Sequence, residues 1–575
     1  MKKIDDARKT RYAIHHYLGT NLKIKAVDQE IPYDKKALLK IIDQHHLNAV
    51  SVQLFVFLAI LIVGLFKNNE NFQLPAAASG FLFASFFIMF TGFFSYWLRG
   101  WAITGIIVLL FGFNLLVKNE FIDSNYQAFG LNYSIERADY SVQTIEEQNN
   151  DSQFNADKDS TSQILKNWRQ KFPTDEKPKM LFICSSGGGQ RAALWTMVVL
   201  QHVDSVLHGD IMKNTILMTG ASGGLIGSSY YRELYLRKLQ GEPINLHNEE
   251  YAYNISKDVL NPMVFSLVVS DLFLRFQKKT IGDYQYSVGR GYAFEEQLNA
   301  NMGGVFSKTI SDYALPEKKG DIPMLLMSPT VINDGRKLYI SPQHVSYMCR
   351  TAPFQNDLFN PRIRGIDFRR FFEQQDAQNL RFLSALRMSA TFPYITPNVQ
   401  LPCSPPMEIM DAGLSDNYGI LDAIRFMYNF RDWIEENTSG VVIISIRDSD
   451  KNPAVKSKDA PSIWSKVFNP IGSLYTNWDY LQDFSNDMAL DYASEWFNNE
   501  LDLVTFQYVP RPKNWDLLKE KNINPKDLQD EYQKERASLS WHLTKREKES
   551  IKRTIHEDYN VVALNKLRKL LNANE

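Results

Sequence analysis

The stretch KMLFICSSGGGQRAALWTMVVLQHV, residues 179–203, decides the fold of this chain. An uninterrupted apolar run leads into three glycines at 187–189, and apolar residues at helical spacing follow them. This order predicts a strand, a tight turn and a helix. The stretch TILMTGASGG, residues 215–224, repeats the same plan. Two such units in succession predict an α/β domain in which helices cover a sheet of buried parallel strands.

Further apolar runs extend the predicted domain to residues 176–510. GVVIISIRD (440–448) and DLVTFQYVP (502–510) have the length and composition of buried strands. IPMLLMSPTVINDGRKLYISP (322–342) predicts a hairpin whose turn is Asn333, Asp334 and Gly335, because these residue types favour tight turns.

The N-terminal part of the chain has a different texture. A polar segment, 1–49, precedes three apolar runs that contain no charged residue: Val50–Phe66, Leu74–Leu98 and Trp101–Val117. At about 1.5 Å per residue, a helix of 17 residues extends about 25 Å, which suffices for a thin bilayer. Residues 50–117 therefore predict a transmembrane region of three helices in an integral, multi-pass membrane protein. Three buried core helices are the alternative.

Charge gives a weak indication of orientation. Ten Lys or Arg residues lie in the first 46 positions, and Arg99 lies between the second and third runs. The positive-inside rule places both regions in the cytoplasm. Three spans would then put everything after Val117 on the other side, but one span more or fewer reverses this result. The side of the membrane that holds the α/β domain stays open.

Two polar segments flank the α/β domain. Residues 118–175 include EEQNNDSQFNADKDSTSQ (146–163), which has almost no apolar residue and predicts a linker or long loop. Residues 511–575 contain 15 basic and 11 acidic residues, which predicts a charged helical segment with a solvated face. A contact with a membrane surface is the alternative for these charges.

The composition argues against several classes of function. A net charge of −1 does not favour a nucleic-acid-binding protein. Cys184, Cys349 and Cys403 are far apart, and no histidine or acidic cluster has metal-ligand spacing. We therefore expect neither a metal nor another cofactor.

Gly220-Ala221-Ser222-Gly223-Gly224 meets the pattern G-x-S-x-G. In that pattern a serine lies on a strained turn between strand and helix, with its hydroxyl exposed, although a plain tight turn has the same composition. A serine nucleophile needs a base. The available histidines lie in polar loops, a hairpin or the charged tail, which favours surface positions for them: His247, His344, His542 and His556. A carboxylate base is therefore favoured.

The candidate base lies in MEIMDAGLSDNYGI, residues 407–420. Asp411 follows an apolar run and precedes Ala412 and Gly413, which predicts a position at the end of a strand. Asp416, in a Ser-Asp-Asn setting, is typical of a helix cap or turn. A plain turn residue is the alternative for Asp411.

The glycine turn from Ser186 to Arg191 could hold an anion, because its amides and a helix N-terminus point the same way. The anion could be a bound phosphate or a transient oxyanion. A nucleotide site is not favoured, because neither GxxxxGK[ST] nor GxGxxG is present.

Together these motifs resemble the patatin-like and cytosolic phospholipase A2 group. The resemblance rests on SGGGxR, GxSGG about thirty residues later, SALRMSATFPYITP (384–397) and a late D-x-G, which span residues 185 to 420. It implies a three-layer α/β/α catalytic domain with a Ser-Asp dyad, Ser222 as nucleophile and Asp411 as base. It also implies an oxyanion site at Gly187, Gly188 and Gly189, with Arg191 near the substrate phosphate or the turn itself.

Two positions depart from the patatin pattern. Ser186 stands where patatins usually have Asp, and Ala412 stands in the usual Asp-Gly-Gly. Both changes lean toward the cytosolic phospholipase A2 pattern.

The function implied by the resemblance and the apolar runs is that of a membrane-anchored lipid acyl hydrolase. It would cleave fatty-acyl esters of phospholipids or lysophospholipids, with membrane lipids as substrate and no nucleic-acid partner. A serine esterase or protease acting on non-lipid substrates is one alternative. A non-catalytic membrane protein with an anion-binding glycine turn is the other. The oligomeric state stays open.

Overall fold

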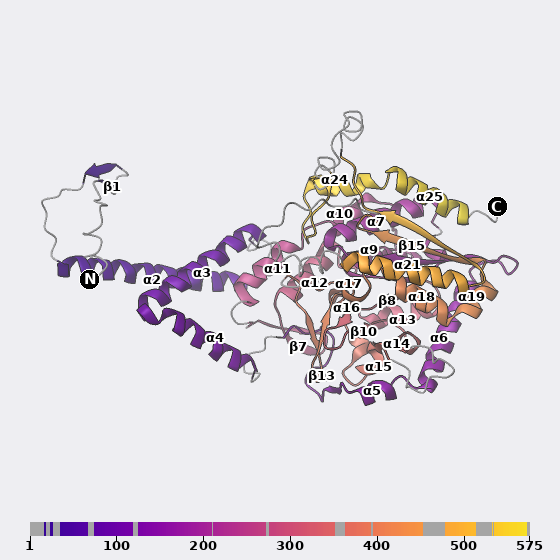
Figure 1. Ribbon diagram of the computed structural model, residues 1–575, viewed down its shortest axis with the longest axis horizontal. Helices are drawn as coiled ribbons and strands as arrows, with labels where there is room; N and C mark the ends of the chain where they lie inside the picture. Colours follow the sequence, from indigo (N-terminus) through magenta and orange to yellow (C-terminus); the bar gives the residue numbers. More distant parts are fainter. Residues whose placement is uncertain are drawn as a thin grey trace. The chain divides into compact units, whose positions relative to one another are not determined.

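The computed structural model describes residues 16–18, 23–26, 35–66, 74–118, 125–209, 211–271, 275, 277–350, 363–392, 395–451, 478–512, 532 and 534–571. It divides into two compact units, residues 1–62 with 86–106, and residues 63–85 with 107–575 (Figure 1). The second unit contains both glycine-rich turns and Asp411.

Three apolar helices form where the three apolar runs predict them: α2 (Lys35–Leu65), α3 (Ala76–Leu98) and α4 (Ala102–Lys118). A short 3-10 turn, η2 (Arg99–Trp101), separates α3 from α4, and a small hairpin, β1 (His16–Leu18) and β2 (Ile24–Ala26), precedes α2. Leu47–Gly64 and Ala76–Leu98 are long and apolar enough to cross a membrane, with mean hydropathies of 2.3 and 1.8, whereas the apolar part of α4 is shorter. Three membrane spans remain a prediction.

The main sheet has five parallel strands in the order β16-β15-β4-β5-β8. Their bounds are β4 (Lys179–Ser185), β5 (Thr215–Gly220), β8 (Met324–Met327), β15 (Gly440–Arg447) and β16 (Glu500–Gln507). Every residue of β4, β5 and β15 is buried, as expected of central parallel strands covered on both faces. The four strands predicted from apolar runs in this region are confirmed.

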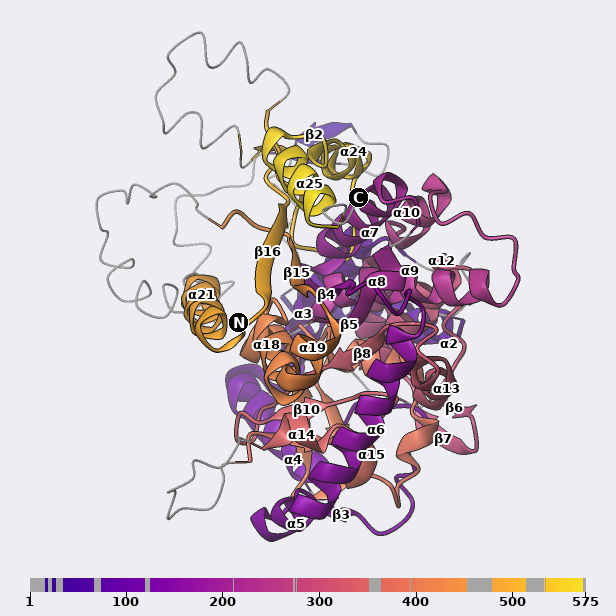
Figure 2. The same ribbon diagram turned by 90° about the vertical axis from the view of Figure 1, so that its right-hand side faces the viewer.

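Alternate side chains of β4 enter two separate cores. Leu181 and Ile183 pack with α7 (Gly189–Val206) and α9 (Ser222–Leu239). Met180 and Phe182 pack on the opposite face with α6, α18, α19 and α21, whose bounds are Asp151–Arg169, Ile420–Asn429, Arg431–Asn437 and Trp478–Trp496. Figure 2 shows these two helical layers on either side of the sheet. The predicted three-layer α/β/α arrangement follows from this alternation.

A second sheet of five short strands has the order β11-β10-β9-β14-β12. Their bounds are β9 (Thr330–Val331), β10 (Lys337–Tyr339), β11 (Gly365–Asp367), β12 (Val399–Leu401) and β14 (Met407–Met410). The antiparallel pair β9 and β10 confirms the hairpin around Asn333–Gly335. The beginning of the predicted 322–342 hairpin belongs instead to β8 in the main sheet, because its fully apolar side chains are buried on both faces.

The predicted linker at 118–175 is wrong over much of its length. Residues Val142–Glu147 form α5 and Asp151–Arg169 form α6, whose N-cap Asn150 accepts a hydrogen bond from the Gln153 amide. A narrow apolar stripe within this polar sequence, ending at Trp168, enters the core. The average composition conceals such a stripe, since one buried residue per turn is enough to dock a helix.

The charged tail is helical, as predicted, where the structure describes it. The helices are α24 (Lys545–Thr554) and α25 (Asp558–Leu571). Thr544 and Glu547 form a capping box at the start of α24. Ile551 and Leu567 belong to the core beside the sheet, and α25 packs against β16. The tail therefore completes the second unit, with one face buried and one face solvated. Residues 513–531 lie outside the described part of the chain.

The remaining elements, in chain order, are β3 (Ala138–Asp139), α8 (Ile211–Asn214), α10 (Glu249–Ile255), α11 (Leu260–Ser266), the π-helical η3 (Leu267–Asp271), β6 (Lys278–Ile281), β7 (Tyr284–Ser287), α12 (Arg290–Asn301), η4 (Ile310–Tyr313), α13 (Ala314–Lys318), α14 (Ser346–Cys349), α15 (Phe368–Phe371), η5 (Ala377–Asn379), α16 (Phe382–Met388), β13 (Cys403–Ser404) and α17 (Gly413–Asp416).

Substitution of Trp168 tests whether α6 is part of the folded domain. Its side chain is fully buried, and its indole Nε1 donates to the Lys213 carbonyl at 3.0 Å. We expect Trp168→Ala to lower the free energy of unfolding by about 3–5 kcal/mol, because it leaves a large cavity. The exposed Val142→Ala in the same segment should change it by less than about 0.5 kcal/mol. Urea unfolding measures both, and equal small effects would mean that α6 does not stabilise the domain.

Candidate active site

Ser222 lies on a sharp turn between β5 and α9. Its φ is 48°, in the left-handed region that non-glycine residues rarely adopt. A Cβ atom at Gly220 would overlap the Ser185 carbonyl oxygen, and one at Gly223 would overlap the Gly189 carbonyl oxygen. The small residues around Ser222 are therefore required by the close approach of two backbones.

The glycine turn at 187–189 lies directly against this serine turn. A Cβ atom at Gly187 would be 3.3 Å from the Ser222 Cβ. The Gly187 amide donates to both the backbone carbonyl and the side-chain Oδ1 of Asn417, at 3.1 Å each. Within the part of the chain that the structure describes, the amides of Gly188 and Gly189 have no hydrogen-bond acceptor. Two donors at the start of α7 are thus available to an anion.

Arg191 lies behind the glycine turn and is engaged by protein groups. Its Nε donates to the Asp448 carboxylate at 3.1 Å, and its Nη1 donates to the Ala537 carbonyl at 2.7 Å. The Asp448 amide in turn donates to the Ser186 hydroxyl at 2.8 Å. A Cβ atom at Gly188 would overlap the Asp448 carboxylate. Of the two positions expected for Arg191, the structure therefore places its guanidinium at the turn.

Asp411 follows β14 and lies next to Ser222, although 188 residues separate the two in the sequence. Its Oδ1 accepts a hydrogen bond from the Gly413 amide at 2.7 Å. Burial raises the pKa of the Asp411 carboxyl to about 7, although hydrogen bonds from the Gly413 amide and the Ser222 hydroxyl act in the opposite direction. The Ser222 hydroxyl therefore lies close enough to the Asp411 carboxyl to influence its pKa.

Asp416 has the structural position that its sequence context predicts. Its carboxylate accepts hydrogen bonds from the amides of Gly419 and Leu421, at 2.8 and 3.1 Å, where α18 begins. Lys337 from β10 contacts the same carboxylate at 3.3 Å. Asp416 therefore fixes the chain that follows Asp411.

Sequence reasoning missed two residues that hold the Asp411 loop. The Asn417 amide donates to the Gln482 Oε1 at 2.7 Å, and the Gln482 Nε2 donates to the Gly413 carbonyl at 2.9 Å. Gln482 lies on α21, outside every motif, so no local pattern could have indicated it. Asn417 directly follows Asp416 in the stretch 407–420 that contains Asp411. This position was the available signal that Asn417 belongs to the site.

Three of the histidines considered as bases pair with other acidic groups and keep substantial exposure. His247 contacts Asp204 at 3.0 Å, and His542 contacts Asp258 at 2.7 Å. His344 lies 3.5 Å from Asp367. His556 packs edge-on against His202. These partners are consistent with the predicted surface positions.

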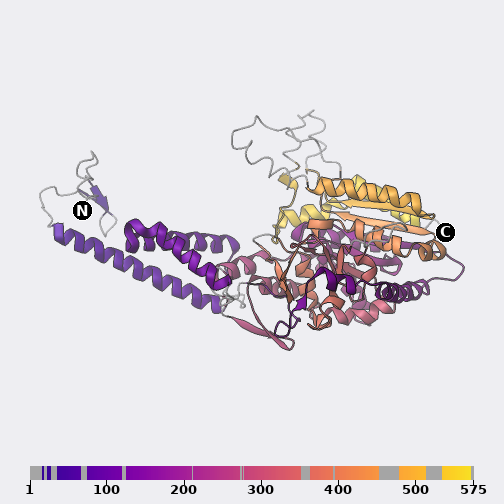
Figure 3. The same ribbon diagram turned by 60° about the horizontal axis from the view of Figure 1, so that its bottom comes forward.

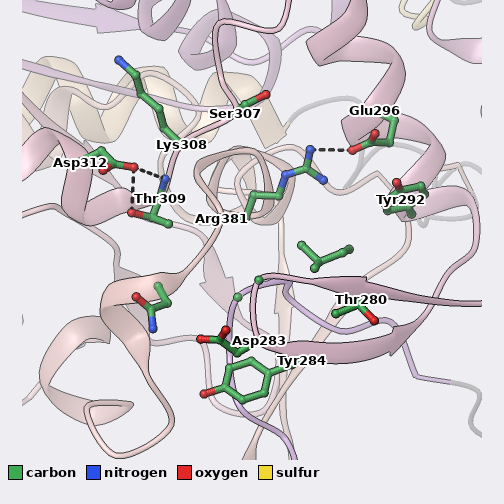
Figure 4. A pocket seen from close by; sticks show the side chains of 14 residues that line it. Thr280, Asp283, Tyr284, Tyr292, Glu296, Ser307, Lys308, Thr309, Asp312 and Arg381 are labelled. Atoms are coloured by element: carbon green, nitrogen blue, oxygen red, sulfur yellow. Dashed lines mark hydrogen bonds and ion pairs between the residues drawn. The ribbon is translucent and has the colours of Figure 1, made fainter.

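A cavity of about 500 Å³ lies elsewhere in the domain and contains none of the predicted site residues (Figure 4). It is lined by the β6–β7 hairpin, α12 and the segments around Lys308 and Arg381. The Arg381 guanidinium donates to Glu296 at 2.6 Å, and the Lys308 ammonium donates to Glu233 at 2.7 Å. Its main cations are therefore already paired.

Known proteins resemble this chain in the region that contains both glycine-rich turns and Asp411. Residues 183–424 match the family model described as patatin-like phospholipase, which confirms the resemblance seen in the motifs. Human GIVD cytosolic phospholipase A2, solved in complex with methyl gamma-linolenyl fluorophosphonate, is 14% identical with a TM-score of 0.31, over 73% of this chain and 64% of that chain. VipD from Legionella pneumophila is 12% identical with a TM-score of 0.24, over 68% and 67%. No curated protein sequence matches. Because both structural likenesses are low, the assignment rests on the match at 183–424.

Substitution of Arg191 tests whether its ion pair with Asp448 stabilises the glycine turn. Arg191→Met leaves the Asp448 carboxylate buried without its partner, so we expect the free energy of unfolding to fall by about 3–5 kcal/mol. The double variant R191M/D448N removes that unpaired charge and should be more stable than R191M. Urea unfolding measures the difference. An R191M protein with unchanged stability, but a raised KM for phospholipid, would place the guanidinium at the substrate instead.

Proposed function

We propose that this chain, which carries a patatin-like phospholipase domain at 183–424, is a lipid acyl hydrolase with a Ser222–Asp411 dyad. One observation carries the proposal. Ser222 lies on a strained turn beside two amides that have no acceptor among the described residues, and its hydroxyl lies next to a carboxyl whose pKa burial raises to about 7. Nucleophile, base and oxyanion donors are the three parts that acyl transfer requires.

In the first half of the reaction, the Asp411 carboxylate accepts the Ser222 proton as Oγ attacks the ester carbonyl carbon. The carbonyl electrons move onto oxygen, and the oxyanion accepts hydrogen bonds from Gly188 and Gly189. The motifs imply that Gly187 is also an oxyanion donor. We leave it out of that role because its amide already donates to Asn417. When the carbonyl reforms, the alcohol leaves with the proton held by Asp411.

In the second half, water attacks the acyl-enzyme ester while Asp411 accepts its proton. Collapse of this intermediate releases the fatty acid, and the proton returns to Ser222. A base whose pKa is near 7 can both accept and return a proton at neutral pH. The raised pKa of Asp411 therefore lets a carboxylate do what a histidine does in other serine hydrolases.

The substrates that we assign are fatty-acyl esters of phospholipids or lysophospholipids, in keeping with the family of the domain. Leu47–Gly64 and Ala76–Leu98 support a membrane anchor by length and hydropathy. An anchor would raise the local concentration of acyl substrate around the site, since both would be confined to the same surface.

Substitution of either dyad member tests the mechanism. We expect Ser222→Ala and Asp411→Asn each to lower kcat for phospholipid hydrolysis by about 10³-fold or more, because both act in one proton transfer. Ser222→Ala should also abolish labelling by a fluorophosphonate probe. The exposed Ser205→Ala and Asp432→Asn are matched controls that should retain wild-type rates. Full activity in Ser222→Ala would remove the mechanism, whereas activity on non-lipid esters alone would change the substrate class.

The pH profile tests the role of Asp411 as a base. Its carboxyl is protonated below its pKa of about 7 and cannot then accept the Ser222 proton. We expect kcat/KM to fall about tenfold per pH unit below that value and to level off above it. Initial rates on a soluble ester between pH 5 and 9 give the profile. A rate that does not change across about pH 6 to 8 would contradict this assignment.

A further inference from the structure

Helix α21 turns an apolar face toward solvent. Apart from Tyr480, its exposed apolar side chains recur every three or four residues. We name this set the α21 stripe: Trp478, Leu481, Phe484, Met488 and Tyr492, which are 41, 57, 67, 39 and 64% exposed. The opposite face of α21 supplies the domain core, through buried Asn486 and Ala493. Figure 3 shows α21, in orange, on the outer side of its layer, and no other described helix covers it. Amphipathic helices of globular proteins normally bury such a stripe.

The α21 stripe begins beside the loop that carries Asp411. The Trp478 indole Nε1 donates to the Leu414 carbonyl at 3.2 Å. One turn later, the Gln482 Nε2 donates to the Gly413 carbonyl at 2.9 Å. Leu414 itself is 36% exposed and extends the apolar surface toward Asp411. Helix α21 is therefore hydrogen-bonded to the loop that follows Asp411.

Asp483 and Asp487 lie beside the stripe, whereas the exposed Asp491 lies seven residues after Phe484 and therefore on the same face. The carboxylate of Asp483 accepts hydrogen bonds from Arg447, one of them 2.6 Å long, and Asp487 pairs with Lys451 at 2.7 Å. These pairs neutralise the flank that faces the protein. The sequence of α21 contains no Lys or Arg. The helix thus offers apolar area with aromatic rings, and it offers no cation to attract anionic headgroups.

We infer that the α21 stripe lies in the interface of a phospholipid bilayer, where it brings the Asp411 loop to the lipid. The inference rests on the proposed function, because a lipid acyl hydrolase must reach a substrate that resides in the bilayer. Trp and Tyr at the ends of the stripe and aliphatic or aromatic residues between them suit the boundary between headgroups and acyl chains. Insertion depends on apolar area, so neutral phosphatidylcholine suffices as the partner.

Site-specific labelling tests the insertion itself. The three native cysteines are buried, so Ser485→Cys, on the exposed side next to Phe484, can carry an NBD fluorophore. The full chain is reconstituted in phosphatidylcholine liposomes with and without a doxyl-labelled phosphatidylcholine quencher. We expect quenching at residue 485 to be about threefold or more stronger than at Ser494→Cys, an exposed position off the stripe. Equal quenching at both positions would overturn the inference. An NBD signal that depends on protein density but not on the quencher would assign the stripe to a second copy and overturn it too.

Activity separates this inference from the proposed function. For L481S/F484S/M488S, the ratio of bilayer phospholipid hydrolysis to soluble short-chain ester hydrolysis should fall by about tenfold or more. V561S/V562S, which removes exposed apolar side chains from α25, should leave both rates near those of the wild type. An unchanged ratio in the triple variant would overturn the inference. A wild-type chain that hydrolyses neither substrate would refute the proposed function, while the quenching result would still decide where the stripe lies.

Discussion

The site depends on a close approach between two backbones at the carboxyl ends of β4 and β5. These parallel strands lie side by side, and each leads through glycines into a helix of the same layer. A side-chain carbon at Gly223 would overlap the Gly189 carbonyl, so the turns can meet only where no Cβ intervenes. At this approach Ser222 adopts a left-handed conformation, and the glycine turn that begins α7 lies against it. The candidate nucleophile and the candidate anion donors thus lie together where two backbones approach closely.

The candidate base comes from a different part of the fold. β14 belongs to the second sheet, and the chain after it is held by Asp416, Asn417 and Gln482 through backbone hydrogen bonds. Such anchoring keeps a carboxyl beside Ser222 at a place where burial disfavours its charge. Burial at this position raises the pKa of the Asp411 carboxyl to about 7. Behind the glycine turn, Arg191 forms an ion pair with Asp448, and the Asp448 amide donates to the Ser186 hydroxyl. These contacts hold the backbone of the turn in place.

Sequence patterns could predict the features that depend on neighbouring residues or on the composition of a segment. Glycines between an apolar run and a helix indicated both turns, and full apolarity in 440–448 indicated a central strand. The composition of 118–175 misled, because the buried stripe of α6 occupies few positions in a polar sequence. The partners of Arg191 and the contact of Gln482 with Gly413 join segments far apart in the chain, so no periodicity encodes them. Gly187 shows the same limit: its glycine was recognisable, but the use of its amide by Asn417 depends on the fold.

In the proposed mechanism, Ser222 carries the acyl group during turnover. Rapid acid quench of the full chain mixed with a phospholipid, followed by peptide mapping in a mass spectrometer, detects that intermediate directly. We expect a fatty-acyl adduct on the peptide containing Ser222, and its loss as the fatty acid is released. Two results would contradict this mechanism. One is turnover with the acyl group on another residue, and the other is the absence of a covalent adduct at every time point although ester cleavage precedes release of the fatty acid.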